Sequence, residues 1–297
     1  MIEKLEFLLA LARERHFRRA AEACGVTQPT LSAAIKQLEE SFGILLVNRD
    51  SRFQDFTAEG ERVLEWARRI VSDARAMRED IQALKHGLSG RLRIAAIPAA
   101  LATIETLTTL YHERHPAVQF TVLARSSEHV LKLLENLEID AGVMYVDDEP
   151  LGRFTAMPLY REGYRLVTAA DAPLGDRATV TWAEVARLPL CLLTPDMQSR
   201  HRVDDLLRGA GGDPRPALES NSMVVLYSHV RSGRWATVMP SRLAATLGLA
   251  DLLRAIPIVE PEASHTIGLV LPSRQPMKPL TAALAAEGRR AAQLLAE

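Results

Sequence analysis

Several features that define well-known classes of protein are scarce or absent in this sequence. It has two cysteines in 297 residues, Cys24 and Cys191, far apart and without a CxxC pair, so no disulfide framework is expected. No apolar run reaches the roughly 20 residues that a membrane-spanning helix needs. The N-terminal stretch MIEKLEFLLALARERHF carries acids and no small-residue cleavage site, unlike a secretory signal peptide. These absences predict a reduced, cytoplasmic protein with no membrane partner.

An excess of charge of either sign is also missing. The formal net charge is −1, and residues 1–60 hold 8 lysines and arginines against 9 aspartates and glutamates. The basic footprint of many nucleic-acid-binding domains is therefore weak, and an argument for DNA binding has to come from geometry. The length allows two or three domains, and 47% hydrophobic residues is typical of a globular protein.

Catalytic and metal-binding motifs are missing as well. The sequence has no GxSxG, no P-loop and no GxGxxG in a suitable context. His112 and His115 lie three residues apart, but zinc would need further ligands, and a solvated helix end explains them better. Cys191 stands in the apolar stretch LPLCLLT, which indicates a buried core residue rather than a redox switch with Cys24. We expect no enzyme activity, no metal and no cofactor.

The first recognisable motif is a helix-turn-helix. The stretch FRRAAEACG predicts a short helix that ends at Gly25, and Thr27 suits the N-cap of the next helix. The second helix of such a motif enters the DNA major groove by its N-terminal end. Here that helix carries apolar residues at steps of 4, 3 and 4, which predicts one buried stripe of Leu31, Ile35, Leu38 and Phe42.

The outward end of this helix has small and neutral polar side chains. Small residues let the backbone approach the base edges, and hydroxyl and amide groups can donate and accept hydrogen bonds there. A helix N-terminus also favours phosphate contacts. The predicted DNA-binding residues of the two helices are Arg18, Gln28, Pro29, Thr30, Ser32, Ala33 and Lys36.

A β-hairpin is expected at residues 45–57, LLVNRDSRFQDFT, because strand-like residues flank the turn-forming NRDS. It would form the wing of a winged helix-turn-helix. Arg49 and Arg52 at its tip are predicted to reach phosphates or a minor groove. Solvated arginines on a surface turn are the alternative.

A long helix follows the hairpin and carries a heptad pattern over three repeats. Apolar residues at steps of 4 and 3 favour pairing with a second helix, here between subunits. An amphipathic helix packed on its own domain would show a similar period. The predicted dimerisation residues are Val63, Ala67, Ile70, Ala74, Met77, Ile81 and Leu84. The stretch KHGLSG at 85–90 breaks the helix and indicates a hinge.

From Arg91 onward, strand-like and helical stretches alternate, which predicts an α/β domain with parallel strands. Strands are expected at 91–98, 118–124, 139–146, 164–170, 188–194, 215–221, 235–240 and 265–272. Helices are expected at 101–114 and 127–137, and an amphipathic helix closes the chain at 278–297.

Residues 17–60 resemble the DNA-binding domain of the LysR-type transcriptional regulators. The family pattern of Arg-Ala-Ala, Gln-Pro, Ser, Leu-Glu, Gly, Leu, Arg and Thr-x-x-Gly occurs in the same order, from Arg19 to Gly60. Arg18 stands where the family often has Ser, and Val47 stands where it often has Phe, but neither departure changes the expected fold. The C-terminal part matches the family by organisation more than by motif.

The resemblance implies an α/β protein in three parts. Residues 1–58 would be an all-α winged helix-turn-helix, 59–89 a dimerising linker helix and hinge, and 90–297 an effector domain similar to type 2 periplasmic binding proteins. Lobe I of that domain would cover about 90–161 and 266–297, and lobe II about 162–265.

The resemblance also implies partners. The family forms homo-oligomers, often tetramers built from two dimers whose linker helices pair antiparallel. They bind double-stranded DNA at interrupted inverted repeats in promoters, with RNA polymerase as a further partner. A small molecule between the lobes alters how the subunits bend DNA.

Four loops at the carboxyl ends of predicted strands should face the crevice between the lobes. Each brings small or hydroxyl residues to the start of a helix, where free N–H groups bind anions. The family often has Ser or Thr in the first loop, where this chain has Pro and Ala. N-caps and turn residues are the alternative explanation. The predicted effector-binding residues are Pro98, Ala99, Ala100, Ser126, Ser127, Thr194, Pro195 and Asn221.

The predicted function is transcriptional regulation controlled by a small, anionic co-inducer. The chain is also similar to regulators found with NAD-dependent formate dehydrogenase operons, without a diagnostic motif, which would make formate the effector. A LysR-type regulator that responds to an aromatic or another short-chain carboxylate is one alternative. A ligand-binding protein or enzyme whose first 60 residues serve only assembly is another.

Overall fold

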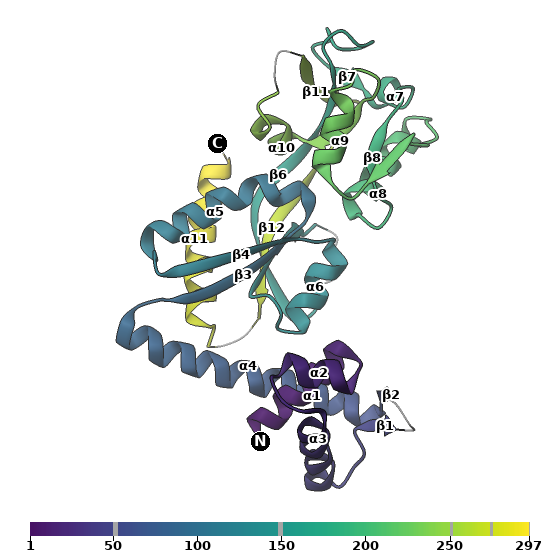
Figure 1. The fold of residues 1–297 in the computed structure, drawn as a ribbon. Helices are drawn as coiled ribbons and strands as arrows, with labels where there is room; N and C mark the ends of the chain where they lie inside the picture. The colour runs from purple at the N-terminus through teal and green to yellow at the C-terminus, as the bar shows by residue number, and fades with distance from the viewer. Residues whose placement is uncertain (50–52, 148–150, 250–251, 274–275, 297) are drawn as a thin grey trace. The chain divides into compact units, whose positions relative to one another are not determined.

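The computed structural model describes residues 1–49, 53–147, 151–249, 252–273 and 276–296. The chain divides into two compact units (Figure 1). The first unit is Met1–Leu88 with Glu135–Glu138 and Pro276–Pro279, and the second is Ser89–Leu134, Ile139–Gln275 and Leu280–Glu297. In the described ranges, no helix is long and apolar enough to cross a membrane.

The first unit is a group of helices with a two-stranded hairpin, as the sequence predicts. The hairpin is antiparallel, with Val47 opposite Phe56, and lies between the third and fourth helices in the chain. The elements are α1 (Ile2–Glu14), α2 (Phe17–Ala23), α3 (Gln28–Phe42), β1 (Val47–Arg49), β2 (Phe53–Phe56) and α4 (Ala58–His86). All four helices contribute to a single core. The predicted winged helix-turn-helix is therefore the observed fold.

The buried face of α3 differs from the predicted stripe at its C-terminal end. Leu31, Ile35 and Leu38 are fully buried, whereas Phe42 is 43% exposed. Phe42 is the last residue of the helix, and the chain turns at Gly43 with a φ of 68°. The apolar periodicity of α3 continues to Phe42, but no neighbouring element in the described part of the chain covers this end of the helix. The prediction that Phe42 is buried was therefore wrong.

A buried acid on α3 fixes the start of the hairpin. The Glu39 carboxylate is 7% exposed and accepts hydrogen bonds from the backbone N–H groups of Leu46 (3.0 Å) and Val47 (3.3 Å). A buried carboxylate is tolerated when it is hydrogen-bonded in this way. Glu39 thus ties α3 to the start of the hairpin.

The second unit is an α/β structure built on a mixed sheet. Its strand order is β4-β3-β5-β12-β6-β11-β7, and β10 also pairs with β6. Strand β3 runs parallel to β4 and β5, as the sequence predicts, but β12 is antiparallel to β5 and β6. The strands are β3 (Gly90–Ala96), β4 (Val118–Ala124), β5 (Ala141–Tyr145), β6 (Phe154–Ala169), β7 (Val180–Thr181), β8 (Cys191–Leu193), β9 (Leu218–Ser220), β10 (Thr237–Pro240), β11 (Leu253–Val259) and β12 (Ser264–Pro272).

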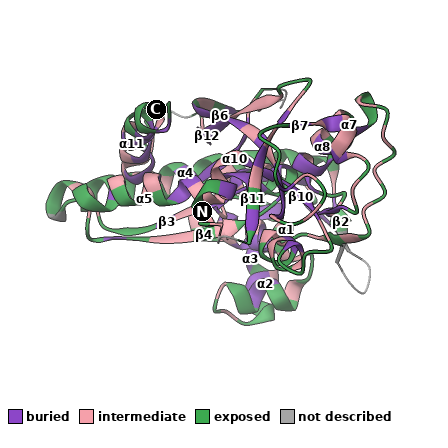
Figure 2. Ribbon diagram, turned by 90° about the horizontal axis from the view of Figure 1, so that it is seen from above, coloured by how far each residue is buried: buried purple, intermediate pink, exposed green. Residues whose placement is uncertain are grey.

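Helices cover both faces of this sheet (Figure 1). An added Cβ at Gly142 on β5 would lie 2.5 Å from Val130 of α6, and one at Gly288 of α11 would lie 2.8 Å from Leu269 of β12. The two glycines therefore permit close packing on opposite faces. The helices are η1 (Pro98–Ala100), α5 (Leu101–Arg114), α6 (Ser127–Glu135), α7 (Trp182–Val185), α8 (Gln198–Gly209), α9 (Met223–Val230), α10 (Ser241–Thr246) and α11 (Pro279–Ala296). Figure 2 shows buried residues along the strands and exposed residues on the outward sides of α5 and α11.

Strand β6 joins two lobes of this unit. From Phe154 to Gly163 it pairs with β12, and from Tyr164 to Ala169 it pairs with β10 and β11. The chain passes between the lobes a second time where β12 begins, with Ser264 opposite Gly163. We call the part built on β3, β4, β5 and β12 lobe I and the part built on β7 to β11 lobe II.

Candidate functional site

The N-terminus of α3 is held by its own cap. The Thr27 side chain accepts a hydrogen bond from the Thr30 backbone N–H (3.4 Å), and the two hydroxyls lie 2.8 Å apart. Pro29 occupies the first turn, and the preceding turn passes through Gly25 with a φ of 68°. A polar side chain that caps an N-terminus in this way stabilises the start of the helix.

The predicted DNA-binding residues of α2 and α3 lie on the surface of the first unit. Arg18 pairs with Glu22 (2.9 Å) and Lys36 lies 3.7 Å from Glu40, and all four side chains are exposed. Exposed pairs contribute little stability, so either pair can open at little cost in free energy. We call the following residues the recognition face: Gln28, Pro29, Thr30, Ala33 and Lys36, which are exposed, and Ser32, which is half-buried.

The wing is described only in part. Arg49 belongs to β1 by its backbone, but its side chain and all of Arg52 lie outside the described residues. Their predicted contacts with phosphates or a minor groove therefore stay predictions.

The heptad residues of α4 divide into two groups. Ala67 is fully buried and Val63 is packed against the core of the first unit, together with Leu64 and Val71. The prediction that Ala67 faces a partner subunit was therefore wrong, since the period of 3.6 does not distinguish a helix's own domain from its partner. Ala74 is half-buried. A separate exposed stripe contains Trp66, Ile70, Met77, Ile81 and Leu84, and Trp66 was missed because it falls outside the heptad steps.

The predicted effector loops occupy different environments in the second unit. Pro98, Ala99 and Ala100 are buried in η1, whereas Pro195 and Asn221 are exposed. The Thr194 hydroxyl oxygen is buried and has no hydrogen-bond partner among the described residues. Of these six residues, only Thr194 and Asn221 have polar side chains.

Two of the loops meet between the lobes. Ser127, the first residue of α6 in lobe I, donates from its hydroxyl to Oε1 of Gln198, the first residue of α8 in lobe II, over 2.7 Å. Ser126 lies beside it, with its hydroxyl 2.8 Å from Nδ1 of His129. Ser127 is 4% exposed and Gln198 is half-buried, so this hydrogen bond is a partly buried link between the lobes.

A further polar cluster between the lobes was not predicted. We call Tyr145, Tyr164, Arg202 and His265 the tyrosine cluster; they come from β5, β6, α8 and β12. The Arg202 guanidinium lies over the Tyr145 ring, 4.5 Å from its centroid, and contacts Nδ1 of His265. The His265 ring lies 5.9 Å from each tyrosine ring. Tyr145 could have been found, because it ends a strand facing the crevice.

Both tyrosine hydroxyls of this cluster are buried and lie near each other, and neither makes a hydrogen bond of good geometry in the described part of the chain. Tyr145 is 1% exposed and Tyr164 is 6% exposed. Burial raises the pKa of Tyr145 well above its ordinary value and raises the pKa of Tyr164 to about 12. Both phenols therefore keep their protons near neutral pH and remain hydrogen-bond donors.

An acid offsets part of the positive charge beside the tyrosines. Burial pushes the pKa of Asp147 upward, but hydrogen bonds from Thr266 and the nearby His265 and Arg202 outweigh it, so the pKa is lowered. Asp147 Oδ2 lies 3.8 Å from Nδ1 of His265. The cluster thus combines two phenol donors, a guanidinium and an imidazole, which is a set suited to oxyanions.

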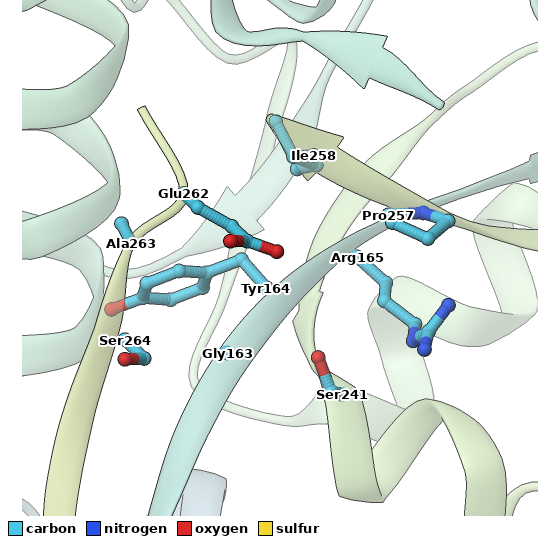
Figure 3. Close-up of a pocket in the computed structure, with 9 residues that line it drawn as sticks. All are labelled: Gly163, Tyr164, Arg165, Ser241, Pro257, Ile258, Glu262, Ala263 and Ser264. Carbon is cyan, nitrogen blue, oxygen red and sulfur yellow. The ribbon is translucent and has the colours of Figure 1, made fainter. Parts of the chain in front are cut away.

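Two cavities border Tyr164. One lies in lobe II, has a volume of about 10 Å³, and is lined partly by Leu193, Ser199 and Met223. A cavity of that size holds about one water molecule. The other, which we call the hinge pocket, has a volume of about 270 Å³ (Figure 3). It is lined by Gly163, Tyr164, Arg165, Ser241, Pro257, Ile258, Glu262, Ala263 and Ser264.

Neither cysteine lies in a setting that favours a reactive thiolate. Cys191 is fully buried, with its Sγ 3.6 Å from the Ala236 carbonyl oxygen and 3.7 Å from that of Leu226. Burial raises the pKa of Cys191 to about 11, and burial also raises the pKa of Cys24. Within the described ranges, no group of three His, Cys, Asp or Glu residues could hold a metal ion.

Comparisons with known proteins match both units. Residues 2–61 match the family model of the bacterial regulatory helix-turn-helix protein, lysR family, and residues 85–293 match the LysR substrate binding domain. A hydrogen peroxide-inducible genes activator of Dickeya chrysanthemi is 29% identical over 278 residues, covering 93% of this chain and 91% of the relative. A probable nitrogen assimilation transcriptional activator of Synechococcus elongatus is 26% identical, with 92% and 89% covered.

Solved structures agree with these matches. A full-length OxyR variant from Pseudomonas aeruginosa has a TM-score of 0.77 at 25% identity, covering 97% of this chain and 94% of that one. Full-length CbnR in complex with its target DNA has a TM-score of 0.64 at 20% identity, with 98% and 99% covered, which shows the shared fold.

Proposed function

Because this chain belongs to the LysR family of DNA-binding transcriptional regulators, we propose that it binds an interrupted inverted repeat at a promoter under the control of a small oxyanion held between its lobes. We further propose that it acts as a homotetramer and contacts RNA polymerase there. The observation that carries the choice of effector is the pair of buried tyrosine hydroxyls beside Arg202.

The recognition face supports the proposed contact with DNA. Its side chains are small or neutral at the capped end of α3, where an approach to base edges is easiest. Gln28 would read a base, whereas Lys36 and Arg18 would contact phosphates. Arg49 and Arg52 of the wing are proposed to add phosphate or minor-groove contacts.

Fluorescence anisotropy with the DNA upstream of the gene tests this assignment. Gln28→Ala should relax specificity at one base pair and cost about 1–3 kcal/mol on the preferred sequence. Lys36→Ala should weaken binding to all sequences. It should also reduce the slope of log affinity against log salt concentration by about 1 in magnitude. Lys132→Ala removes an exposed lysine from the second unit and is the control. Equal effects of Lys36→Ala and Lys132→Ala would contradict the proposed interface.

The tyrosine cluster supports a small anionic effector. A carboxylate can accept hydrogen bonds from the phenols of the cluster while its charge faces Arg202. Ser126, Ser127, Thr194 and the backbone of the first loop are proposed as neighbouring contacts. We propose formate, the smallest carboxylate, as the first candidate, with an aromatic or another short-chain carboxylate as the alternative.

Calorimetry with formate, acetate and benzoate tests the effector class. The double variant Tyr145→Phe with Tyr164→Phe keeps both rings and removes only the hydroxyls, so we expect the affinity for the preferred carboxylate to fall about tenfold or more. Tyr111→Phe is the control, because the Tyr111 hydroxyl donates to the Leu280 carbonyl oxygen (3.1 Å) away from the cluster. No heat and no thermal shift with any of these carboxylates would refute the anionic effector.

The peroxide-responsive relatives favour a second candidate function, in which the chain senses hydrogen peroxide. Thiol-based sensing needs an accessible thiolate. Residues 89–297 contain one cysteine, Cys191, which is buried and has a raised pKa. We therefore propose that the effector of this chain acts by binding and not by oxidation of a cysteine.

A further inference from the structure

We propose that His265 is a pH-sensitive latch between the two lobes. When its imidazole is neutral, it accepts a hydrogen bond from Arg202 and holds lobe II against lobe I. When its imidazole is protonated, it pairs with Asp147 and releases lobe II. The proton is then an input to this regulator that goes beyond the proposed oxyanion, because the latch needs no effector.

The contact between His265 and Arg202 joins the lobes. His265 lies on β12 of lobe I, and Arg202 lies on α8 of lobe II. The Arg202 guanidinium contacts Nδ1 of His265 through Nη1 and lies over the Tyr145 ring of lobe I. We call the arrangement with this contact the closed arrangement. The hydrogen bond between Ser127 and Gln198 also joins the lobes, but neither of its partners titrates.

One nitrogen of His265 faces two partners with opposite requirements. An arginine side chain only donates hydrogen bonds, so Arg202 needs Nδ1 without a proton. An ionised carboxylate only accepts, so Asp147, whose Oδ2 lies 3.8 Å from the same Nδ1, needs that nitrogen protonated. The proton on Nδ1 therefore decides which of the two partners the imidazole can bind.

The two partners belong to different lobes, and this sets the direction of the switch. Asp147 follows β5, and its carboxylate accepts a hydrogen bond from the Thr266 backbone N–H on β12, so it stays with His265 in lobe I. Arg202 belongs to lobe II, so its repulsion of a protonated His265 is relieved when the lobes separate. Protonation of His265 thus favours separated lobes and shifts their population.

The other groups around the His265 ring keep this direction. Tyr145 on β5 and Tyr164 on β6 lie 5.9 Å from it between ring centroids, and burial raises the pKa of both, so they stay neutral. Glu162 is opposite His265 in the pairing of β6 with β12. That part of β6 stays paired with lobe I, so the Glu162 charge acts on His265 in both arrangements.

Pulsed electron paramagnetic resonance on the full-length protein measures the separation of the lobes. Lys132→Cys on α6 and Asp205→Cys on α8 place one nitroxide label on each lobe, at exposed positions, in a Cys24→Ala background. Cys191 is fully buried and stays unlabelled. An excess of unlabelled protein leaves one labelled chain in each oligomer.

Acidification should separate the labels. Between about pH 7.5 and about pH 5.5, the range in which histidine ordinarily changes its charge, we expect the ratio of separated to closed lobes to rise about tenfold or more. The physical reason is the repulsion between two cations in contact, which is strong near a protein surface.

Three variants locate the response. His265→Asn keeps an acceptor for Arg202 and cannot titrate, so its lobes should stay closed at both pH values. Asp147→Asn keeps an acceptor for the Thr266 N–H but removes the charge that stabilises the imidazolium, so it should reduce the change. His112→Asn makes the same substitution at an exposed histidine of α5 and is the matched control, which should keep the full change.

Ser127→Ala distinguishes the latch from a general loosening of the lobes. It removes the link that does not titrate, so it should raise the separated fraction at both pH values and keep the dependence on pH. The proposal is overturned if the label distances are the same at both pH values, or if His265→Asn responds to acid as His112→Asn does. Neither result bears on the oxyanion effector, because no carboxylate is added.

Discussion

Burial of the Glu162 carboxyl group makes the stability of the folded state depend on pH. The residue is 1% exposed, and its carboxyl group accepts a hydrogen bond from the Arg242 backbone N–H (3.2 Å) and lies near the Tyr160 hydroxyl. Burial raises the pKa of Glu162 from 4.5 to about 7. A raised carboxyl pKa favours the folded state below about pH 4.5, and this contribution is lost as the pH rises through about 7.

Glu162→Gln should therefore stabilise the protein at high pH. Glutamine stays neutral, so the free energy of unfolding at pH 8 should exceed that of the wild type by up to about 3 kcal/mol, with a much smaller difference at pH 5. Urea unfolding of the second unit at both pH values measures this. Glu113→Gln, at an exposed position, should change neither value, and an equal gain from Glu162→Gln at pH 5 and pH 8 would refute the titration.

Cys191 supports a second prediction at this scale. Because the thiol is buried and its pKa is raised to about 11, hydrogen peroxide should oxidise it slowly. We expect DNA binding to be unchanged after brief exposure to peroxide, in the wild type and in Cys191→Ala alike. Mass spectrometry of the intact protein, together with anisotropy on DNA, measures both. Rapid sulfenic acid formation at Cys191 with a change in DNA affinity would favour the peroxide-sensing function.

Among the elements, α4 has two apolar faces, one buried and one exposed. One face, with Leu64, Ala67 and Val71, completes the core of the first unit, and the other leaves Ile70 and Ile81 exposed. An exposed apolar stripe of this length on a helix is characteristic of association. We propose that the exposed stripe, rather than the whole predicted heptad, pairs the subunits.

The double substitution Ile70→Glu with Ile81→Glu should dissociate the proposed oligomer. Two charges in a buried helix pair would weaken it by roughly tenfold or more, while the fold should persist because both residues are exposed in the single chain. Light scattering after size-exclusion chromatography gives the mass. Val224→Glu, at an exposed valine of α9, is the control. An unchanged oligomer would exclude this stripe as the interface.

At the scale of the whole molecule, the division into two units matters most. The first unit has its own core, and the apolar clusters of lobe II belong entirely to the second. Separate cores allow separate unfolding. A regulator of this kind can change the conformation of its effector unit without unfolding the part that binds DNA.

Calorimetric unfolding should accordingly show two transitions. A saturating carboxylate effector should raise the free energy of unfolding of the second unit only. The increase should be about 2.7 kcal/mol when the effector concentration is 100 times the dissociation constant. DNA should raise the unfolding temperature of the first unit only. Scanning calorimetry with each ligand measures this, and a single transition shifted by both ligands would show that the units unfold together.

The sequence by itself determined the local elements and the family. Periodicity and caps located α3, Thr27 marked its start, and the ordered motif from Arg19 to Gly60 identified the DNA-binding domain. These features depend on residues near one another in the chain. The strand LRAIPIV was missed because Pro257 interrupts its pattern, although as β11 it pairs with both β6 and β7.

Only the tertiary structure decided which residues meet across the fold. Tyr145 and Arg202 are far apart in the chain, yet packing of the lobes places the guanidinium on the ring. Packing within the first unit made Ala67 a core residue and left Phe42 on the surface. Burial, and with it the raised pKa of Glu162, arises from contacts between distant segments. No local pattern encodes such contacts, because a side chain's solvent exposure is set by whatever element packs over it.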